Sequence, residues 1–177
     1  IRLPSSFDRS ASTVSDDKIL TAQAGAGAAS GSYTVQVTQL AKANQVTNKA
    51  VKAVSGTTEV VSSGAGTFTF RVGSGTDQTI TLSAGATLDD LRSAINDLGA
   101  GVTASVINTG TEASPAYRLT LTATASGAAN TITVVTDTTT LDFTNTSGTG
   151  GNDTLQAGQN AIVVIGDPDQ TKISIER

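Results

Sequence analysis

Paired aspartates are the side chains of this 177-residue sequence best suited to acid–base or metal chemistry. The pairs are Asp16 with Asp17, Asp89 with Asp90, Asp137 with Asp142, and Asp167 with Asp169. A glycosidase or a magnesium site could use two such carboxylates. Each pair, however, falls in an expected turn or at an expected helix start, where Asp is favoured because it hydrogen-bonds nearby backbone amides. We therefore expect no catalytic residue and no metal ligand among them.

A glycine-rich segment offers a second candidate for metal binding. Gly148 to Leu155 reads G-T-G-G-N-D-T-L and nearly matches one turn of the calcium-binding repeat G-G-x-G-x-D-x-U-x. A roll of that kind requires several stacked turns, and the residues after Leu155 do not continue the pattern. We interpret the segment as a flexible Gly/Asn turn. The other glycine clusters lack the Lys and the following helix of a phosphate-binding loop, so we expect no cofactor.

The composition excludes most enzyme classes. Cys and His are absent, which removes thiolate nucleophiles, Cys-ligated zinc and the commonest general base. The net charge of −4 and the isoelectric point of about 4.6 argue against a nucleic-acid partner. No apolar run approaches the ~20 residues of a membrane span. These properties favour a structural or binding protein.

Alternation of apolar and polar residues dominates the chain and predicts a mainly β (α+β) fold. The pattern is clear from Ser32 to Gln39 and from Thr67 to Val72. A Gly/Ser/Thr turn then leads into Gln78 to Leu82, which predicts a hairpin. Further alternating runs cover residues 102–107, 116–123, 130–135, 161–165 and 171–175. Thr is β-branched yet polar and suits the exposed face of such strands.

One segment carries helical periodicity instead. Thr87 and Asp90 have the spacing of a capping box, and Gly99 can supply a left-handed stop. Between them, Leu88, Leu91, Ile95 and Leu98 form one apolar stripe. The sequence therefore predicts a helix at about 88–98 that lies on a sheet.

Two stretches rich in Gly, Ser and Thr, residues 49–66 and 137–159, suggest domain seams. We expect a first β domain formed by residues 1–56 plus 151–177. A second β domain, residues 57–150, would be inserted in it and would carry the helix. The chain starts at Ile1 without an initiator Met, which we interpret as a sign of an internal fragment of a longer protein.

Several motifs, in order along the chain, resemble one known family. Residues 31–44, G-S-Y-T-V-Q-V-T-Q-L-A-K-A-N, resemble the signature of the flagellar filament cap proteins, the hook-associated protein 2 family. Residues 79–106 and 118–122 are similar to the motif that this family shares with flagellins. Residues 173–177, I-S-I-E-R, match a further family motif, whereas Gly166 to Asp169 departs from the expected hairpin turn.

The resemblance implies a structural, non-enzymatic function. Members of this family form a ring at the distal tip of the growing flagellum and assist the insertion of exported flagellin. The chain would then be extracellular and would belong to the outer plate of the cap. Its expected partners are further copies of the full-length protein and flagellin. The composition leaves an alternative open, a bacterial surface adhesin module that binds host glycans or mucus, although exposed aromatic and paired carboxylate sites are few.

Overall fold

The structure is a computed structural model that describes residues 11–18, 20–28, 31–144, 150–166 and 172–175. It divides into two units, Ile1–Thr34 and Val35–Arg177. The described part of the first unit contains turns and no helix or strand. In one of these turns the Asp16 carboxylate accepts a hydrogen bond of 2.9 Å from the backbone amide of Lys18. Asp16 thus serves the backbone conformation, as the sequence predicts.

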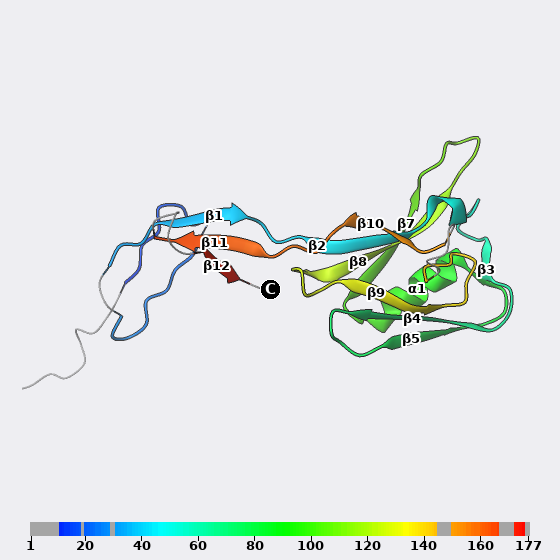
Figure 1. The fold of residues 1–177 in the computed structure, drawn as a ribbon, viewed down its shortest axis with the longest axis horizontal. Helices are drawn as coiled ribbons and strands as arrows, with labels where there is room; N and C mark the ends of the chain where they lie inside the picture. Colours follow the sequence, from blue (N-terminus) through cyan, green and yellow to red (C-terminus); the bar gives the residue numbers. More distant parts are fainter. Residues whose placement is uncertain (1–10, 19, 29–30, 145–149, 167–171, 176–177) are drawn as a thin grey trace, which may run out of the picture. The chain divides into compact units, whose positions relative to one another are not determined.

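The second unit is built from antiparallel sheets (Figure 1). One sheet has the order β1 (Val35–Gln39), β11 (Ala161–Ile165), β12 (Lys172–Ile175). A four-stranded sheet has the order β10 (Asn152–Gln156), β2 (Ala43–Asn48), β8 (Tyr117–Ser126), β7 (Val102–Asn108). A third has the order β5 (Gln78–Leu82), β4 (Gly66–Val72), β9 (Ile132–Asp137), and β3 (Val60–Ser62) pairs with β6 (Ala86–Thr87). The mainly β fold is confirmed.

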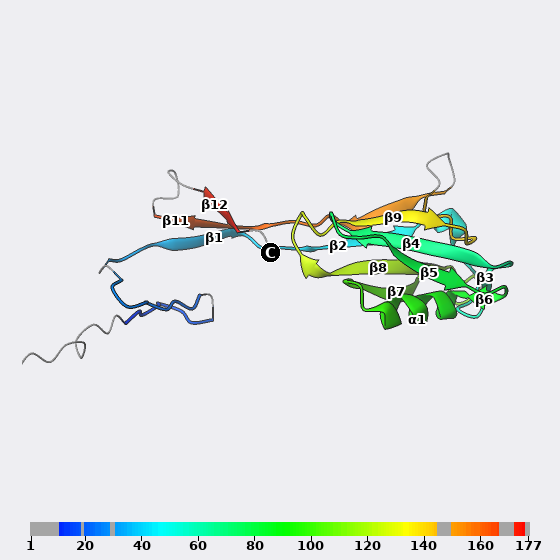
Figure 2. The same ribbon diagram turned by 90° about the horizontal axis from the view of Figure 1, so that it is seen from below.

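The four-stranded sheet, the β5-β4-β9 sheet and the helix α1 (Leu88–Leu98) share one hydrophobic core. Figure 2 shows α1 along β7. The side chain of Asn96 exchanges two hydrogen bonds, of 2.9 and 2.7 Å, with the backbone of Ala104 on β7. These bonds occupy polar groups at an edge of the sheet that would otherwise be open for strand pairing. The largest fully buried apolar side chains are Phe68, Phe70, Leu88, Leu91, Ile95, Leu119, Leu121 and Leu141.

The helix begins and ends as the sequence predicts. Thr87 Oγ1 accepts from the Asp90 amide at 3.2 Å, and Asp90 Oδ2 accepts from the Thr87 amide at 2.9 Å. Gly99 ends the helix with φ at 60°, a left-handed conformation that costs glycine little. Leu88, Leu91 and Ile95 are buried, whereas Leu98, expected on the same stripe, is 41% exposed.

The capping box gives a first prediction. Replacing Thr87 by Ala removes the acceptor for the Asp90 amide, and we expect the free energy of unfolding to fall by about 1 kcal/mol. Urea denaturation followed by circular dichroism measures this change. Thr103→Ala, at an exposed position of β7, is the control for the loss of a Thr side chain. Equal destabilisation by the two substitutions would contradict the assigned role of Thr87.

Two strands of the four-stranded sheet depart from the expected pattern. β2 lies outside every predicted strand because Asn44, Thr47 and Asn48 are buried polar residues that break the alternation. β10 overlaps the segment interpreted as a flexible Gly/Asn turn, so that interpretation is wrong from Asn152 onward. Its structure comes from antiparallel pairing with β2, in which Asp153 lies opposite Thr47.

The expected division into residues 1–56 plus 151–177 and residues 57–150 stays a prediction. The four-stranded sheet contains strands from both parts: β2 and β10 come from the first, and β7 and β8 from the second.

Candidate functional site

The paired aspartates do not assemble into a site among the described residues. Within that part of the chain, no group of three or more Asp, Glu, His or Cys side chains could hold a metal ion. Asp89 forms an ion pair of 2.7 Å with Arg92, and Asp90 belongs to the capping box. Asp167 and Asp169 lie outside the described residues. The carboxylates of Asp89 and Asp90, in the first turn of α1, are therefore engaged in local structure.

Asp137 organises a turn. Its carboxylate accepts from the backbone amides of Thr139, at 2.7 Å, and Phe143, at 2.8 Å. Burial raises the pKa of Asp137 above its ordinary value, and the negative charge of Asp142 acts in the same direction. Asp142 itself forms an ion pair of 3.3 Å with Lys52. The turn directs Leu141 and Phe143 into the core, so the role of Asp137 is structural.

A second polar cluster joins three strands of the four-stranded sheet. This cluster, which we call the charge clamp, consists of Asn48, Lys49, Arg118 and Asp153. Arg118 on β8 is only 8% exposed; it donates from Nε to the Asn48 carbonyl at 2.8 Å, and its Nη2 also donates to that oxygen. The same Nη2 reaches Asp153 Oδ2 on β10 at 2.7 Å, and Lys49 Nζ reaches Asp153 Oδ1 at 2.5 Å.

The side chain of Asn48 completes the charge clamp. It is fully buried, and its Oδ1 accepts from the Leu119 amide at 2.9 Å. Its Nδ2 donates to the carbonyl of Lys52 at 2.8 Å, at the end of the short 3₁₀ helix η1 (Ala50–Lys52). No local motif marks this cluster in the sequence, because Lys49 and Asp153 are 104 residues apart.

The charge clamp bears directly on the calcium candidate. Hydrogen bonds from Lys49 and Arg118 lower the pKa of Asp153, although partial burial opposes them. Both carboxylate oxygens face cationic side chains, and two positive charges repel a divalent cation. These contacts favour a structural role for Asp153 over calcium binding.

A pH dependence follows from this ion pairing. The pKa of Asp153 in the folded chain lies below its ordinary value of 3.8, so its stabilising contribution is present above that pH and is lost as the pH falls through the folded pKa. We expect Asp153→Asn to lower the melting temperature near neutral pH and to reduce the further loss below about pH 4. Thermal melts from neutral pH to about pH 2 measure both effects. Asp77→Asn, which removes the aspartate partner of Arg71, is the control. Equal acid sensitivity of Asp153→Asn and the unsubstituted chain would refute the prediction.

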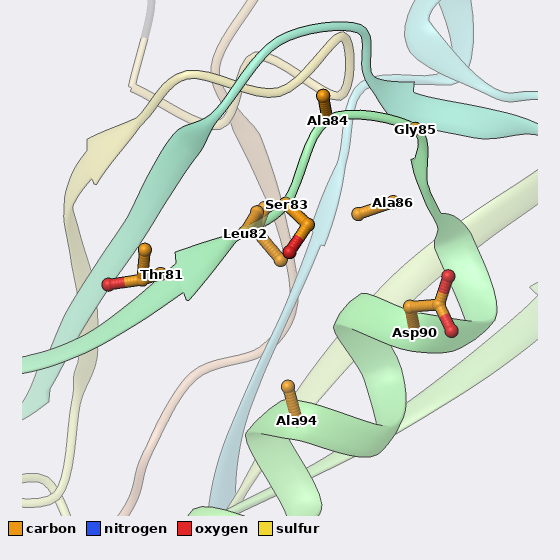
Figure 3. Close-up of a pocket in the computed structure, with 8 residues that line it drawn as sticks. All are labelled: Thr81, Leu82, Ser83, Ala84, Gly85, Ala86, Asp90 and Ala94. Atoms are coloured by element: carbon orange, nitrogen blue, oxygen red, sulfur yellow. The ribbon is translucent and has the colours of Figure 1, made fainter.

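A groove of about 390 Å³ lies between the loop after β5 and α1 (Figure 3). Its lining residues are Thr81, Leu82, Ser83, Ala84, Gly85, Ala86, Asp90 and Ala94. Asp90 is the one ionisable residue of this lining, and its Oδ2 accepts hydrogen bonds from the amide and the hydroxyl of Thr87 in the capping box. The groove therefore offers no arrangement of nucleophile, base and electrophile.

The signature run of residues 31–44 includes two highly exposed apolar side chains. Tyr33 is 74% exposed in the first unit, and Leu40, between β1 and β2, is 72% exposed. Large apolar side chains in such positions are typical of contact surfaces when they occur together. The same run supplies Gln39, Lys42 and Asn44, which contact residues 156–160.

Comparisons with known proteins agree with these motifs. The family model of the flagellar hook-associated protein 2 N-terminus matches residues 1–44, and the flagellin hook IN motif matches residues 67–125. Flagellar hook-associated protein 2 of Escherichia coli (strain K12) is 34% identical over 125 residues. That match covers 70% of this chain, which spans 26% of the length of the relative.

Solved structures share the fold. The D2-D3 domains of the flagellar cap protein FliD from Escherichia coli align with a TM-score of 0.72 at 28% identity, over 87% of this chain and 78% of that chain. The D2-D3 domains of the protein from Serratia marcescens align with a TM-score of 0.69 at 29% identity, over 87% of this chain and 82% of that chain. The resemblance inferred from the sequence is thereby confirmed, and none of these relatives supports the adhesin alternative. The chain belongs to the flagellar hook-associated protein 2 family, the filament cap proteins.

Proposed function

We propose that this chain is a structural part of a bacterial flagellar filament cap, located outside the cell at the filament tip. There it would contribute to the outer plate that assists flagellin insertion. The main support is the combination of the two family segments, in order, with the fold of the FliD D2-D3 domains. Further copies of the parent protein, arranged in a ring, and flagellin are the proposed partners.

We also propose that this chain has no enzymatic activity. It is supported by the local roles of three carboxylates: Asp90 caps a helix, Asp137 holds a turn and Asp153 closes the charge clamp. Stable interfaces and a defined shape are what a plate requires, and buried networks of this kind fix the packing of strands. Among the described residues, no helix is long and apolar enough to cross a membrane.

Site-specific labelling of the parent protein tests the proposed location. The 177 residues contain no Cys, so Thr79→Cys, at an exposed position of β5, introduces one reactive thiol into this region. We expect a maleimide dye added to living cells to label one spot at the distal end of each filament. The parent protein without the substitution gives the background. Label spread over the cell body, with unlabelled filament tips, would contradict the cap and support a surface adhesin.

A further inference from the structure

Two chain segments join the β1-β11-β12 sheet to the four-stranded sheet. Along these segments the regular pairing of one strand with the other stops. We call these segments, residues 39–44 and 156–160, the connector. The β1–β11 ladder ends where Gln39 lies opposite Ile162, and the β2–β10 ladder ends where Gln45 lies opposite Gln156. Between these ends one isolated bridge remains, in which Lys42 and Gln159 exchange backbone hydrogen bonds of 2.8 and 3.0 Å.

Irregular pairing also surrounds the connector. The register shifts between Val37 and Gln39 on β1, and between Thr154 and Gln156 on β10. A third shift, between Ala43 and Gln45, interrupts the pairing of β2 with β8. Such bulges leave residues out of the ladder and bend the strand that carries them. Three of them therefore interrupt the regular ladders in and beside the connector.

Side-chain amides replace the missing ladder bonds. Gln39 Nε2 donates to the Asn160 carbonyl at 2.8 Å, and Gln159 Nε2 donates back to the Leu40 carbonyl at 3.1 Å. Asn44 Nδ2 donates to the Gln156 carbonyl at 3.0 Å. Each bond runs from one segment of the connector to the other.

The side-chain oxygens of Asn160 and Asn44 tie the connector to the turn between β8 and β9 and to the start of β9. Asn160 Oδ1 accepts from the Ala128 amide at 2.7 Å, and Asn44 Oδ1 accepts from the Ile132 amide at 2.8 Å. The turn also lies directly against the connector, because a Cβ added at Gly158 would be 2.6 Å from the carbonyl oxygen of Gly127. The turn thus contacts both segments, because the Gly127 amide also donates to the Lys42 carbonyl at 3.1 Å.

We propose that Gln39, Asn44, Gln159 and Asn160 form a latch that holds the connector in one conformation. When the latch opens, the connector becomes the hinge about which the β1-β11-β12 sheet moves relative to the rest of the second unit. An amide latch suits this role because its bonds depend on side-chain rotamers, which change without breaking a strand ladder. The inference concerns the fold of this chain and does not depend on the function proposed above.

Distance measurements between two spin labels test the latch in the 177-residue chain. Because the sequence contains no Cys, Gln36→Cys on β1 and Thr103→Cys on β7 place one label at each side of the connector. A reference pair, Thr79→Cys with Thr103→Cys, lies entirely on the far side of the connector from β1. We expect a narrow distance distribution for both pairs in the chain with an intact latch.

The latch is then opened by the double substitution Gln39→Ala and Gln159→Ala. Both side chains are half-buried, which makes them safer to truncate than buried Asn44. We expect the distribution of distances between the labels at positions 36 and 103 to become about two-fold broader or more. The distance distribution of the reference pair should not change. The matched control is Gln45→Ala, which removes an amide bond of 3.1 Å to Thr122 within the four-stranded sheet; it should leave both distributions narrow.

Two results would overturn the proposal. One is a distribution across the connector that is already as broad in the unsubstituted chain as in the double variant. The other is an unchanged narrow distribution in the double variant. If the reference pair broadens as well, the double substitution has unfolded the chain, and the single substitution Gln159→Ala is measured against the same two results.

Discussion

Replacing Phe68 by Ala is expected to cost about 3–5 kcal/mol of the free energy of unfolding. Phe68 lies on β4 with none of its surface exposed. Its ring meets that of Phe143 edge-on, with centroids 5.6 Å apart, and that of Phe70 at 6.4 Å. The substitution leaves a cavity at a point where three rings and two segments of the chain meet. For a domain whose total stability is about 5–15 kcal/mol, such a loss is large.

Urea denaturation at neutral pH measures this cost, and the chain offers a matched control. Tyr33→Ala also removes an aromatic side chain, but from a position that is 74% exposed, so it should change stability by at most ~0.5 kcal/mol. A Phe68→Ala chain as stable as the Tyr33→Ala chain would show that Phe68 does not lie in the core described above.

The second large effect is expected at Arg118 of the charge clamp. Arg118→Ala removes the donors to the carbonyl of buried Asn48 and one of the two cations that hold Asp153. Hydrogen bonds to charged groups contribute about 1.5–3 kcal/mol each, and the remaining contact of Asp153 with Lys49 limits the damage. We therefore expect Arg118→Ala to lower the free energy of unfolding by about 2–3 kcal/mol, as measured by urea denaturation.

Arg71→Ala is the control for the role of burial. Arg71 also contacts an aspartate, Asp77 at 3.1 Å, but the Arg71 side chain is 40% exposed, against 10% for Arg118. Surface ion pairs contribute about 0–1 kcal/mol, so this substitution should have little effect. A second variant, Arg118→Lys, should remain clearly destabilised because a single ammonium group does not reproduce the planar fork of donors. Equal free energies of unfolding for Arg118→Ala and Arg71→Ala would contradict the stabilising role assigned to the charge clamp.

The sequence predicts those elements whose signals are local. α1 is found because Thr87, Asp90 and Gly99 mark its ends and because its apolar stripe has helical spacing. The hairpin of β4 and β5 is found because alternation on both sides of a Gly/Ser turn is sufficient to specify it. Elements of this kind depend on residues within a few positions of one another.

The other parts of the fold depend on partners far along the chain. β2 and β10 carry buried or half-buried polar residues whose hydrogen bonds come from across the sheet, so no alternation marks them. For the same reason the charge clamp and the connector amides are absent from the sequence-based predictions. Asn44, Asn48 and Arg118 become meaningful only when Gln156, Leu119 and Asp153 lie beside them.

Deleting the gene of the parent protein and measuring flagellin in the culture medium tests the central claim most directly. We expect immobile cells that shed unpolymerised flagellin, with motility and filaments restored when the intact gene is returned. Swimming cells with filaments of normal length and no excess flagellin in the medium would contradict the assignment of this chain to a filament cap.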